Sequence, residues 1–511
     1  MIVNAKRSAY RKRRAWIAVA WATTALVSSC TVGPDFERPA APAVKGYTSE
    51  PLAEGTAATN IAGGEAQHFV KNMDIPGQWW SVFKSPQLNA LIERALKDNP
   101  DLQAAQASLR VAQENVKAQE GFYFPSVTAG YTAERQKIPP SIAGSNPLPS
   151  GAPIFTLHTA QLAVSYAPDV LGLNQRTVES LQAQADVQRF ELAAAHLTLT
   201  SNVVAAAVQE ASLRAQIQAT QEMIQINGRM LELLRNQLAK GSVSRLEVAA
   251  QEAQLSQMAA TLPPLQKQLA LSRDLLTALA GQFPSEEISE KFTLADLHLP
   301  KELPLSLPSK LVEQRPDIRA AEEQLHAASA DVGVAVANRL PQFTIAATAG
   351  GTGTSFQHLL NPADAFWNLL GGVTQPIFDG GTLLHRERGA QAAYDTAAAQ
   401  YRSTVVGAFQ NVADALRALQ YDAQTLNAAV AAKNAAGITL DLTKRQLQSG
   451  SANYLAVLNA EQTYQQAVIS LVQARANRYA DTAALFQALG GGWWNRPDML
   501  TNKNPKQSAS E

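Results

Sequence analysis

The hydrophobic pattern of residues 405–489 predicts two long helices that run antiparallel and pack along one seam. Apolar positions alternate between spacings of three and four, about 3.5 on average, which keeps one helix face against a partner. The first arm of the seam comprises Val405, Phe409, Val412, Leu416, Leu419, Ala423, Leu426 and Val430. The second comprises Leu455, Leu458, Gln462, Gln465, Ile469, Val472, Ala476, Tyr479, Ala483 and Phe486. A helix that begins near Thr382 would be roughly 100 Å long, which suits a strut.

Four shorter segments alternate with period two, which predicts β-strands that have one apolar and one polar face. They span about residues 126–135, 157–167, 342–352 and 366–375. In the first, Val127 and Tyr131 point to one side while Thr128 and Thr132 point to the other. Each segment has about ten residues, the length of a strand that crosses a membrane. A loop rich in Pro, Gly and Ser at residues 138–153 joins the first two.

The chain repeats this plan. Pro100 and Pro125 recur 216 residues later, and the hairpin turn at residues 241–242 recurs 209 residues later. The duplication predicts a first repeat at residues 79–284, a proline-rich connector at 285–308 and a second repeat at 309–494. Its helical hairpins are expected at about residues 174–281 and 382–489. Pro263-Pro264 has no counterpart, so the first returning helix must kink or break there.

The amino terminus reads as an export signal. A basic stretch and an apolar stretch end in small residues before the lone cysteine, so residues 1–29 are a signal peptide. These small residues resemble a bacterial lipobox, which predicts that Cys30 becomes the first mature residue and carries a lipid that anchors the chain without spanning the bilayer. An ordinary signal peptide with an incidental cysteine is the alternative. Residues 30–78 are expected to form an extended strap, and residues 495–511 a flexible tail.

Composition narrows the function. The 43 basic and 43 acidic residues cancel, which argues against a nucleic-acid partner. A single cysteine precludes an intrachain disulfide, and after the signal peptide no uninterrupted apolar run reaches the ~18 residues of a membrane helix. Seven scattered histidines lack the spacing of a metal motif, and the glycines at 350–353 end a strand instead of opening a helix. We therefore expect no cofactor, no metal, no catalytic residue and no enzyme activity.

The predicted strands are too few for a closed structure. Small closed barrels need about eight strands, and an open sheet edge in hydrocarbon costs several kcal/mol for each unpaired backbone group. Identical copies of the chain must therefore complete the sheet. Two copies would leave an interior filled by side chains, whereas three would leave a lumen above a ring of helical hairpins. A lipid-anchored coiled-coil scaffold is the alternative, but it would have no use for strands with apolar faces.

Several motifs resemble those of the outer-membrane factors of tripartite efflux systems, the TolC-like superfamily and its NodT subgroup. They are the lipoprotein start at residues 30–39, Trp79-Trp80, residues 314–318, residues 375–381 and residues 488–493. The resemblance implies a mainly α fold with a membrane β-barrel. In such a trimer, four strands per chain complete a twelve-stranded barrel in the outer membrane, above a long α-helical barrel in the periplasm and a mixed equatorial belt.

The resemblance also implies partners and a function. The partners are a periplasmic adaptor, an inner-membrane transporter of the resistance–nodulation–division (RND) class, and outer-membrane lipid. The function is that of a passive exit channel for drugs or other small amphiphiles, without chemistry of its own. Type I protein secretion remains an alternative.

The same resemblance places the periplasmic aperture and the adaptor-docking surface at the two hairpin tips. These residues are Gly241, Ser242, Val243, Ser244, Arg245 and Leu246, and Gly450, Ser451, Ala452, Asn453, Tyr454 and Leu455. Turn residues without a recognition role are the alternative. Family members often ring this mouth with aspartates, whereas this chain has Ala452, Asn453 and Asn459. We therefore expect a closed mouth to depend on packing, on Arg245, and on hydrogen bonds from Asn453 and Tyr454.

Overall fold

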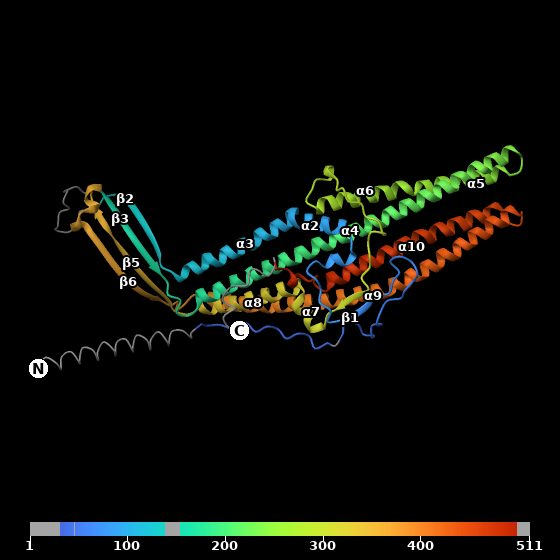
Figure 1. The fold of residues 1–511 in the computed structure, drawn as a ribbon. Helices are drawn as coiled ribbons and strands as arrows, with labels where there is room; N and C mark the ends of the chain where they lie inside the picture. The colour runs from blue at the N-terminus through green and yellow to red at the C-terminus, as the bar shows by residue number, and fades with distance from the viewer. Residues whose placement is uncertain (1–30, 45, 138–153, 498–511) are drawn as a thin grey trace. The chain divides into compact units, whose positions relative to one another are not determined.

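The computed structural model describes residues 31–44, 46–137 and 154–497 (Figure 1). The predicted signal peptide, Cys30, the loop at 138–153 and the end of the tail lie outside the described residues. Contacts divide the chain into two compact units. The strand unit comprises Met1–Arg38, Arg110–Val187 and Glu322–Gln400, and the hairpin unit comprises Pro39–Leu109, Gln188–Ala321 and Tyr401–Glu511. Each unit therefore draws chain from both sequence repeats.

The strand unit contains a four-stranded antiparallel sheet. Its order is β2 (Ser126–Lys137), β3 (Ile154–Tyr166), β5 (Gln342–Gly353) and β6 (Ala365–Thr374). Register places Val127, Val164, Ala347 and Leu369 opposite one another in turn. Directly opposed residues of antiparallel strands point to the same face, so these four residues share an apolar face.

The other face of the sheet is more polar. Thr128, Ala163, Thr348 and Asn368 are opposed in the same way, one position along each strand. The two faces confirm the period-two pattern read from the sequence. The strand ends differ from the predicted ends by only a few residues.

Two helices of equal length leave the sheet. α4 (Leu173–Ala239) and α9 (Thr382–Gln448) each have 67 residues, close to the predicted length. Asp169 accepts hydrogen bonds from the backbone N–H groups of Asn174 and Gln175, and Asp379 accepts them from Gly381 and Leu383. Each carboxylate thus satisfies N–H groups that a helix start leaves unpaired.

The hairpin unit holds the returning helices. α4 returns as α5 (Arg245–Ala260) and α6 (Leu262–Leu279), and α9 returns as α10 (Tyr454–Ala488) (Figure 1). The interruption at Thr261, just before Pro263-Pro264, confirms the predicted break. Most of the predicted seam is buried, with Val412, Leu416 and Leu426 fully inaccessible.

Two seam assignments are wrong, because Gln462 and Leu455 are exposed. Leu455 is 53% exposed, whereas Tyr454 beside it is buried. Asn453 caps the start of α10, and this sets the rotation of the first helical turn, so that Tyr454 and Leu458 face the other hairpin instead.

By length and composition alone, α4 could cross a membrane, although it contains no uninterrupted apolar run of about 18 residues. An 18-residue window of α4 has a mean hydropathy of 1.2 and few charges, but 56% of it is buried inside the protein. A buried core helix passes the same test, so this window is weak evidence for a helix in the bilayer.

Smaller elements complete the fold. Trp79 and Trp80 are 1% exposed, and the Trp79 ring stacks on Phe486 with centroids 5.7 Å apart, so both rings pack in the main core. The remaining helices are η1 (Trp79–Phe83), α2 (Pro86–Asp98), α3 (Pro100–Glu120), η2 (Gly121–Tyr123), η3 (Pro284–Glu286), α7 (Pro308–Gln314), α8 (Pro316–Ala337), η4 (Phe356–Leu360), η5 (Pro362–Asp364) and η6 (Trp493–Asn495).

The strap and the connector are not wholly irregular. β1 (His68–Lys71), in the strap, pairs in parallel with β4 (Glu302–Leu305), in the connector. Four residues are too few to display a period, and the partners lie far apart in the sequence. This pairing therefore depends on tertiary contact.

Candidate functional site: the hairpin tips

Both hairpins reverse through the same backbone geometry. Ser242 N–H donates to Gln237 O at 3.0 Å, and Ser451 N–H donates to Gln446 O at 2.9 Å. The residue before each serine is a glycine in the left-handed region, Gly241 at φ 75° and Gly450 at φ 73°. This is a Schellman turn, which satisfies the last carbonyls of α4 and α9 and needs glycine because a Cβ is disfavoured at that φ.

The helix that follows each turn begins with a side-chain cap. Ser244 Oγ accepts from Glu247 N–H, and the Glu247 carboxylate accepts from Ser244 N–H at 2.7 Å, which makes a capping box. In the second tip, Asn453 Oδ1 accepts from Ala456 N–H at 2.9 Å. The predicted hydrogen bond of Asn453 is therefore local to α10.

The predicted tip residues are mostly exposed. Leu246 is 72% exposed and Leu455 is 53% exposed, and these leucines occupy equivalent positions in the two repeats. Val243 and Ala452 are half-buried, and Tyr454 is 3% exposed. The remaining tip residues face solvent; they are Gly241, Ser242, Ser244, Arg245, Gly450, Ser451 and Asn453.

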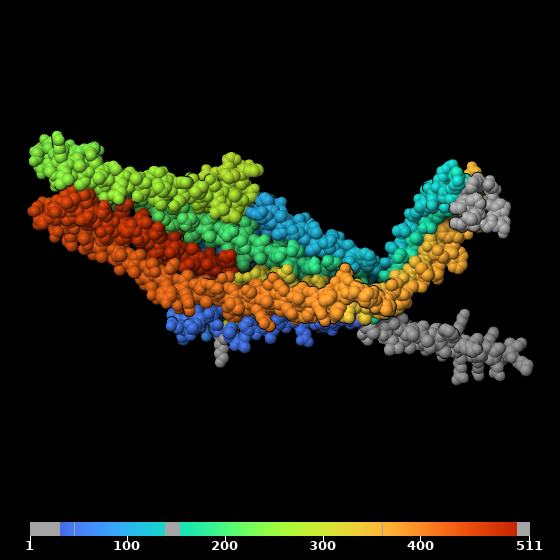
Figure 2. All heavy atoms as spheres, turned by 180° about the vertical axis from the view of Figure 1, so that it is seen from behind, coloured from blue at the N-terminus to red at the C-terminus, as the bar shows by residue number. Residues whose placement is uncertain are grey.

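The two tips lie side by side at one end of the hairpin unit (Figure 2). A small apolar cluster joins them, separate from the main core. Its buried members are Leu231, Leu234, Val248, Tyr454 and Leu458. The cluster takes residues from α4, α5 and α10, so it holds the second hairpin against the first.

A buried hydrogen-bond network continues this contact. Tyr454 Oη donates to Gln251 Oε1 on α5. Gln251 Nε2 donates to both the backbone O and the Oδ1 of Asn227 on α4, each at 2.9 Å. Burial raises the pKa of the Tyr454 hydroxyl, so it stays a protonated donor. Because Gln251 and Asn227 are 0% and 1% exposed, water cannot replace these bonds.

Sequence reasoning anticipated Tyr454 and missed its partners. Gln251 and Asn227 lie on different helices, and neither stands in a motif. The one feature that could have indicated them is a polar amide side chain on a helix face that is buried. The expectation that Arg245 helps to close the mouth remains a prediction, because its exposed side chain forms no ion pair with another described residue.

Near each tip, an ion pair joins the two arms of the hairpin, at equivalent positions of the repeats. Arg235 pairs with Glu252 in the first hairpin, and Lys444 pairs with Glu461 at 3.0 Å in the second. The surroundings differ, because the Glu252 side chain is 47% exposed and that of Glu461 is 4% exposed. Neither Glu461 oxygen accepts a well-aligned hydrogen bond, so the nearby Lys444 charge is its main compensation.

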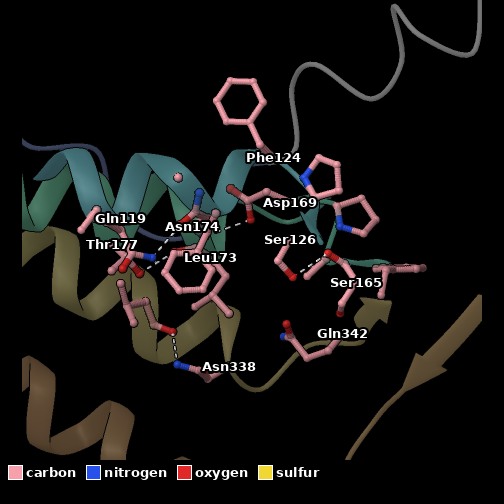
Figure 3. A pocket seen from close by; sticks show the side chains of 18 residues that line it. Gln119, Phe124, Ser126, Ser165, Asp169, Leu173, Asn174, Thr177, Asn338 and Gln342 are labelled. Atoms are coloured by element: carbon pink, nitrogen blue, oxygen red, sulfur yellow. Dashed lines mark hydrogen bonds between the residues drawn. The ribbon is translucent and has the colours of Figure 1, made fainter. Parts of the chain in front are cut away.

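A cavity of about 730 Å³ lies elsewhere, in the strand unit (Figure 3). Its labelled lining includes Gln119, Phe124, Asp169 and Asn174, where α3 and α4 adjoin the strand ends. Asp169 is occupied in capping α4, and Gln119 donates to Asn174 at 2.7 Å. Among the residues that the structure describes, no group of three His, Cys, Asp or Glu is placed to hold a metal ion.

Comparison with known proteins identifies the class. The outer membrane efflux protein family model matches residues 91–282 and 307–491, so the chain belongs to that family. It is similar to the pyoverdine export outer membrane protein OpmQ of Pseudomonas aeruginosa, 30% identical over 90% of this chain and 96% of that protein. It is also similar to the toluene efflux pump outer membrane protein TtgF of Pseudomonas putida, 27% identical over 93% of this chain and 96% of that protein.

Solved structures agree. The outer-membrane channel OprN is similar with a TM-score of 0.81 and 27% identity, over 91% of this chain and all of that one. The outer membrane protein VceC of Vibrio cholerae is similar with a TM-score of 0.76 and 27% identity, over 82% of this chain and all of that one. The family resemblance, the efflux function and the outer-membrane location predicted from the sequence are therefore confirmed.

Proposed function

We propose that the protein is the exit channel of a tripartite efflux pump, a passive homotrimeric conduit for drugs or other small amphiphiles. The observation that carries this proposal is the incomplete sheet. Within the described part of the chain, β2 and β6 each pair on one side only. Their free edges would leave backbone groups unpaired in hydrocarbon, at several kcal/mol each.

Other copies of the chain remove this cost. If β6 of one copy pairs with β2 of the next, three copies close a barrel of about twelve strands, wide enough for a lumen. The apolar face then points to lipid, which fits the exposure of Trp367, Leu369 and Val373 at 79%, 70% and 63%. The more polar face lines the channel.

The relatives support the partners and the cargo. Their names describe outer-membrane components that export pyoverdine or remove toluene. We therefore assign this chain a periplasmic adaptor, an RND-type transporter as the source of energy, and small molecules as cargo. The tips form the aperture and dock the adaptor, which would cover Leu246 and Leu455. A lipid on Cys30 anchors each copy to the outer membrane.

Two substitutions on neighbouring residues of β6 test the barrel. Leu369→Lys places a charge on the apolar face, where it costs about 2–4 kcal/mol in the bilayer, whereas Asn368→Lys places it on the lumen face. We expect Leu369→Lys to reduce the heat-modifiable trimer extracted from outer membranes. Asn368→Lys should assemble normally and alter the ion selectivity of conductance in planar bilayers. Equal assembly of the two variants would contradict the assigned faces.

The tips are tested by function. Deletion of the gene, with a panel of toxic compounds, reports the cargo, and crosslinking from residues 241–246 and 450–455 reports the adaptor. Arg245→Glu and Ala452→Trp should change drug sensitivity while the trimer remains intact. Arg402→Glu, an exposed change on α9 away from the tip, is the control. Unaltered sensitivity in every tip variant would contradict the tips as the docking surface.

A further inference from the structure

The first residues of the strap are bound to the strand unit. Thr31 Oγ1 donates to Gln175 Oε1 at 2.9 Å, and Val32 N–H donates to Leu171 O at 3.3 Å. Leu171 lies in the turn between β3 and α4. The segment that directly follows Cys30 is therefore hydrogen-bonded to the turn between β3 and α4, the end of the sheet that we call its foot.

A close backbone contact continues the attachment. Gly33 adopts φ +94°, and a Cβ built on it would lie 2.4 Å from Cα of Gly333 on α8. A Cβ on Gly333 would in turn lie 3.0 Å from the Arg176 side chain. Glycine inside a helix costs about 1 kcal/mol relative to alanine, and this close approach gives a reason for it here.

Arg176 on α4 hydrogen-bonds to the backbone of the strap. Its side chain is 5% exposed and donates to Val32 O at 3.1 Å and to Gly33 O at 3.4 Å. It also pairs with Glu179 and Asp35, each at 2.7 Å. The Asp35 carboxylate is 92% exposed, so that ion pair contributes little. The buried bonds to the strap carbonyls carry the larger share.

His326 on α8 binds the next part of the strap. Its ring stacks on Phe36 with centroids 4.4 Å apart and an interplanar angle of 15°. Nε2 lies 3.1 Å from a Glu179 oxygen and Nδ1 lies 3.3 Å from a Glu323 oxygen. Beside it, Arg38 pairs with Glu322. An imidazolium held by two carboxylates thus presents its face to a strap aromatic.

These contacts exist in one half of the duplication only. The equivalents of Glu322, Glu323, His326 and Gly333 in the first repeat, 216 residues earlier, are Gln106, Ala107, Arg110 and Lys117. His385 stands at the position equivalent to Arg176, 209 residues later. The duplicated scaffold does not need these residues for folding, since the other half lacks them. One set per chain matches one N-terminal segment per chain.

We propose that Arg176, Glu179, Glu322, Glu323, His326 and Gly333 form a dedicated seat for residues 31–38, and that this seat positions the lipid-bearing N-terminus beside the foot of the sheet. The lipid part rests on the proposed function. Because Cys30 is bonded to Thr31, whatever holds Thr31 limits where an acyl chain on Cys30 can enter the membrane. Arg176 and His326 are thus positioning residues for the modified cysteine.

The seat is pH-dependent. The charged groups in contact with His326 are Glu179 on α4 and Glu323 on α8. The ion pairs beside them add Arg176 on α4, Glu322 on α8, and Asp35 and Arg38 on the strap. Hydrogen bonds to Glu179 and Glu323 raise the pKa of His326 to about 9. Both carboxylates lie on the helices that form the seat, so the strap's own gain from this charge is the contact of the imidazolium with the Phe36 ring, 4.4 Å between centroids. This contact weakens as the pH rises through about 9 and His326 loses its proton.

The test uses the full-length protein in detergent. Cys30 is the only native cysteine, so a nitroxide on Glu37→Cys, an exposed strap position, reports the strap alone when Cys30 is acylated. Mass spectrometry of the N-terminal peptide shows whether Cys30 carries lipid. We expect a restricted nitroxide at pH 7, and a mobile fraction that grows about two- to fivefold at pH 10, as the loss of one cation–π contact predicts.

Matched variants separate the seat from general flexibility. Gly33→Ala and Arg176→Gln should release the nitroxide at pH 7, and His326→Gln should also abolish its pH dependence. Gly46→Ala, a strap glycine with nothing within 4 Å of its Cβ position, should leave it restricted. The swap of Arg38→Glu with Glu322→Arg should restore restriction lost in Arg38→Glu alone.

The outcomes are distinct. A mobile nitroxide in the parent protein at pH 7, or mobility unchanged by Gly33→Ala and Arg176→Gln, would overturn the seat. An unmodified Cys30, with a nitroxide that stays restricted once Cys30→Ser removes the second labelling site, would overturn the lipid part and leave the seat standing. If the lipid is present, Gly33→Ala should lower the yield of outer-membrane trimer, and Gly46→Ala should not. Equal trimer yields would overturn the positioning role.

Discussion

The two hairpin tips have the same backbone geometry and differ in the contacts that their side chains make. Both turn on a left-handed glycine and begin the returning helix with a capped residue. One residue after the cap, the first tip has Arg245, which is exposed, and the second has Tyr454, which is buried. The two turns therefore have the same backbone geometry, but Arg245 exposes a charge to solvent, whereas Tyr454 packs against the other hairpin.

This difference assigns separate roles to the tips. The second hairpin is held at its tip by Tyr454, Gln251 and the small apolar cluster, whereas the first offers Arg245 and Leu246 to solvent. Any opening movement of the second hairpin must break buried contacts with the first. The exposed side chains of Arg245 and Leu246 on the first tip can contact another molecule without breaking these buried contacts.

The largest expected effect comes from Tyr454→Ala. It removes a buried aromatic ring and should lower the local opening free energy of the tips by about 3–5 kcal/mol. Hydrogen–deuterium exchange of peptides around residues 223–260 and 446–462 measures this opening in the full-length protein.

The equivalent change in the other tip is the control. Arg245→Ala should leave exchange unaltered, because the side chain is exposed. Tyr454→Phe isolates the hydroxyl and should cost about 1–3 kcal/mol, since it leaves Gln251 Oε1 buried without its donor. Equal protection in Tyr454→Ala and Arg245→Ala would remove the proposed asymmetry.

The two equivalent ion pairs near the tips should give the next largest effect on stability. Lys444→Ala leaves Glu461 buried without its partner and should destabilise the second hairpin by about 1–3 kcal/mol. Arg235→Ala acts on an exposed pair and should cost about 0–1 kcal/mol. The same exchange experiment compares them, and a cost in Arg235→Ala as large as that in Lys444→Ala would show that burial does not distinguish the hairpins.

The N-caps of α5 and α10 should lose similar amounts of stability when their side chains are removed. Ser244→Ala and Asn453→Ala each remove an N-cap and should each cost about 1 kcal/mol in the first turn of α5 or α10. Ser242→Ala, which leaves the turn's backbone bonds in place, is the control. A marked difference between the two caps, measured by exchange of the adjoining turns, would show that the tips differ in backbone stability as well as in contacts.

The smallest effect on stability should come from the exposed leucines. Leu246→Ser and Leu455→Ser should change local stability by less than about 0.5 kcal/mol, because neither side chain is packed. Both should weaken crosslinking to the adaptor, with Leu246→Ser the stronger if the first tip makes the main contact. Full retention of adaptor crosslinking in the double variant would contradict docking through these leucines.

Much of the fold was predictable because its elements are long and periodic. Helices of 67 residues and strands of ten or more repeat their pattern often enough to fix their type and face. Glycine and proline then marked the turns, as at Gly241 and Gly450 and at the break before Pro263. The short pair β1 and β4 escaped because four residues carry no period.

The candidate site was predictable only in part. Its location followed from the turn residues and the family resemblance, and Tyr454 was anticipated as a hydrogen-bond donor. The orientation of the first turn of α10 was not, so Leu455 was placed on the seam in error while Tyr454 took that position. The roles of Gln251 and Asn227 could not be predicted, because no local pattern in the sequence shows that α4 and α5 pack against Tyr454.

By itself, the sequence determined which stretches are helix and strand, where they reverse, and which face of each strand is apolar, because these properties depend on residues a few positions apart. Only the tertiary structure decided which of two equivalent tip residues is buried, which ion pair is shielded, and which helix pair receives the strap. Those choices depend on contacts between segments hundreds of residues apart, such as Arg38 with Glu322 and Gln251 with Tyr454. A local pattern cannot record such contacts.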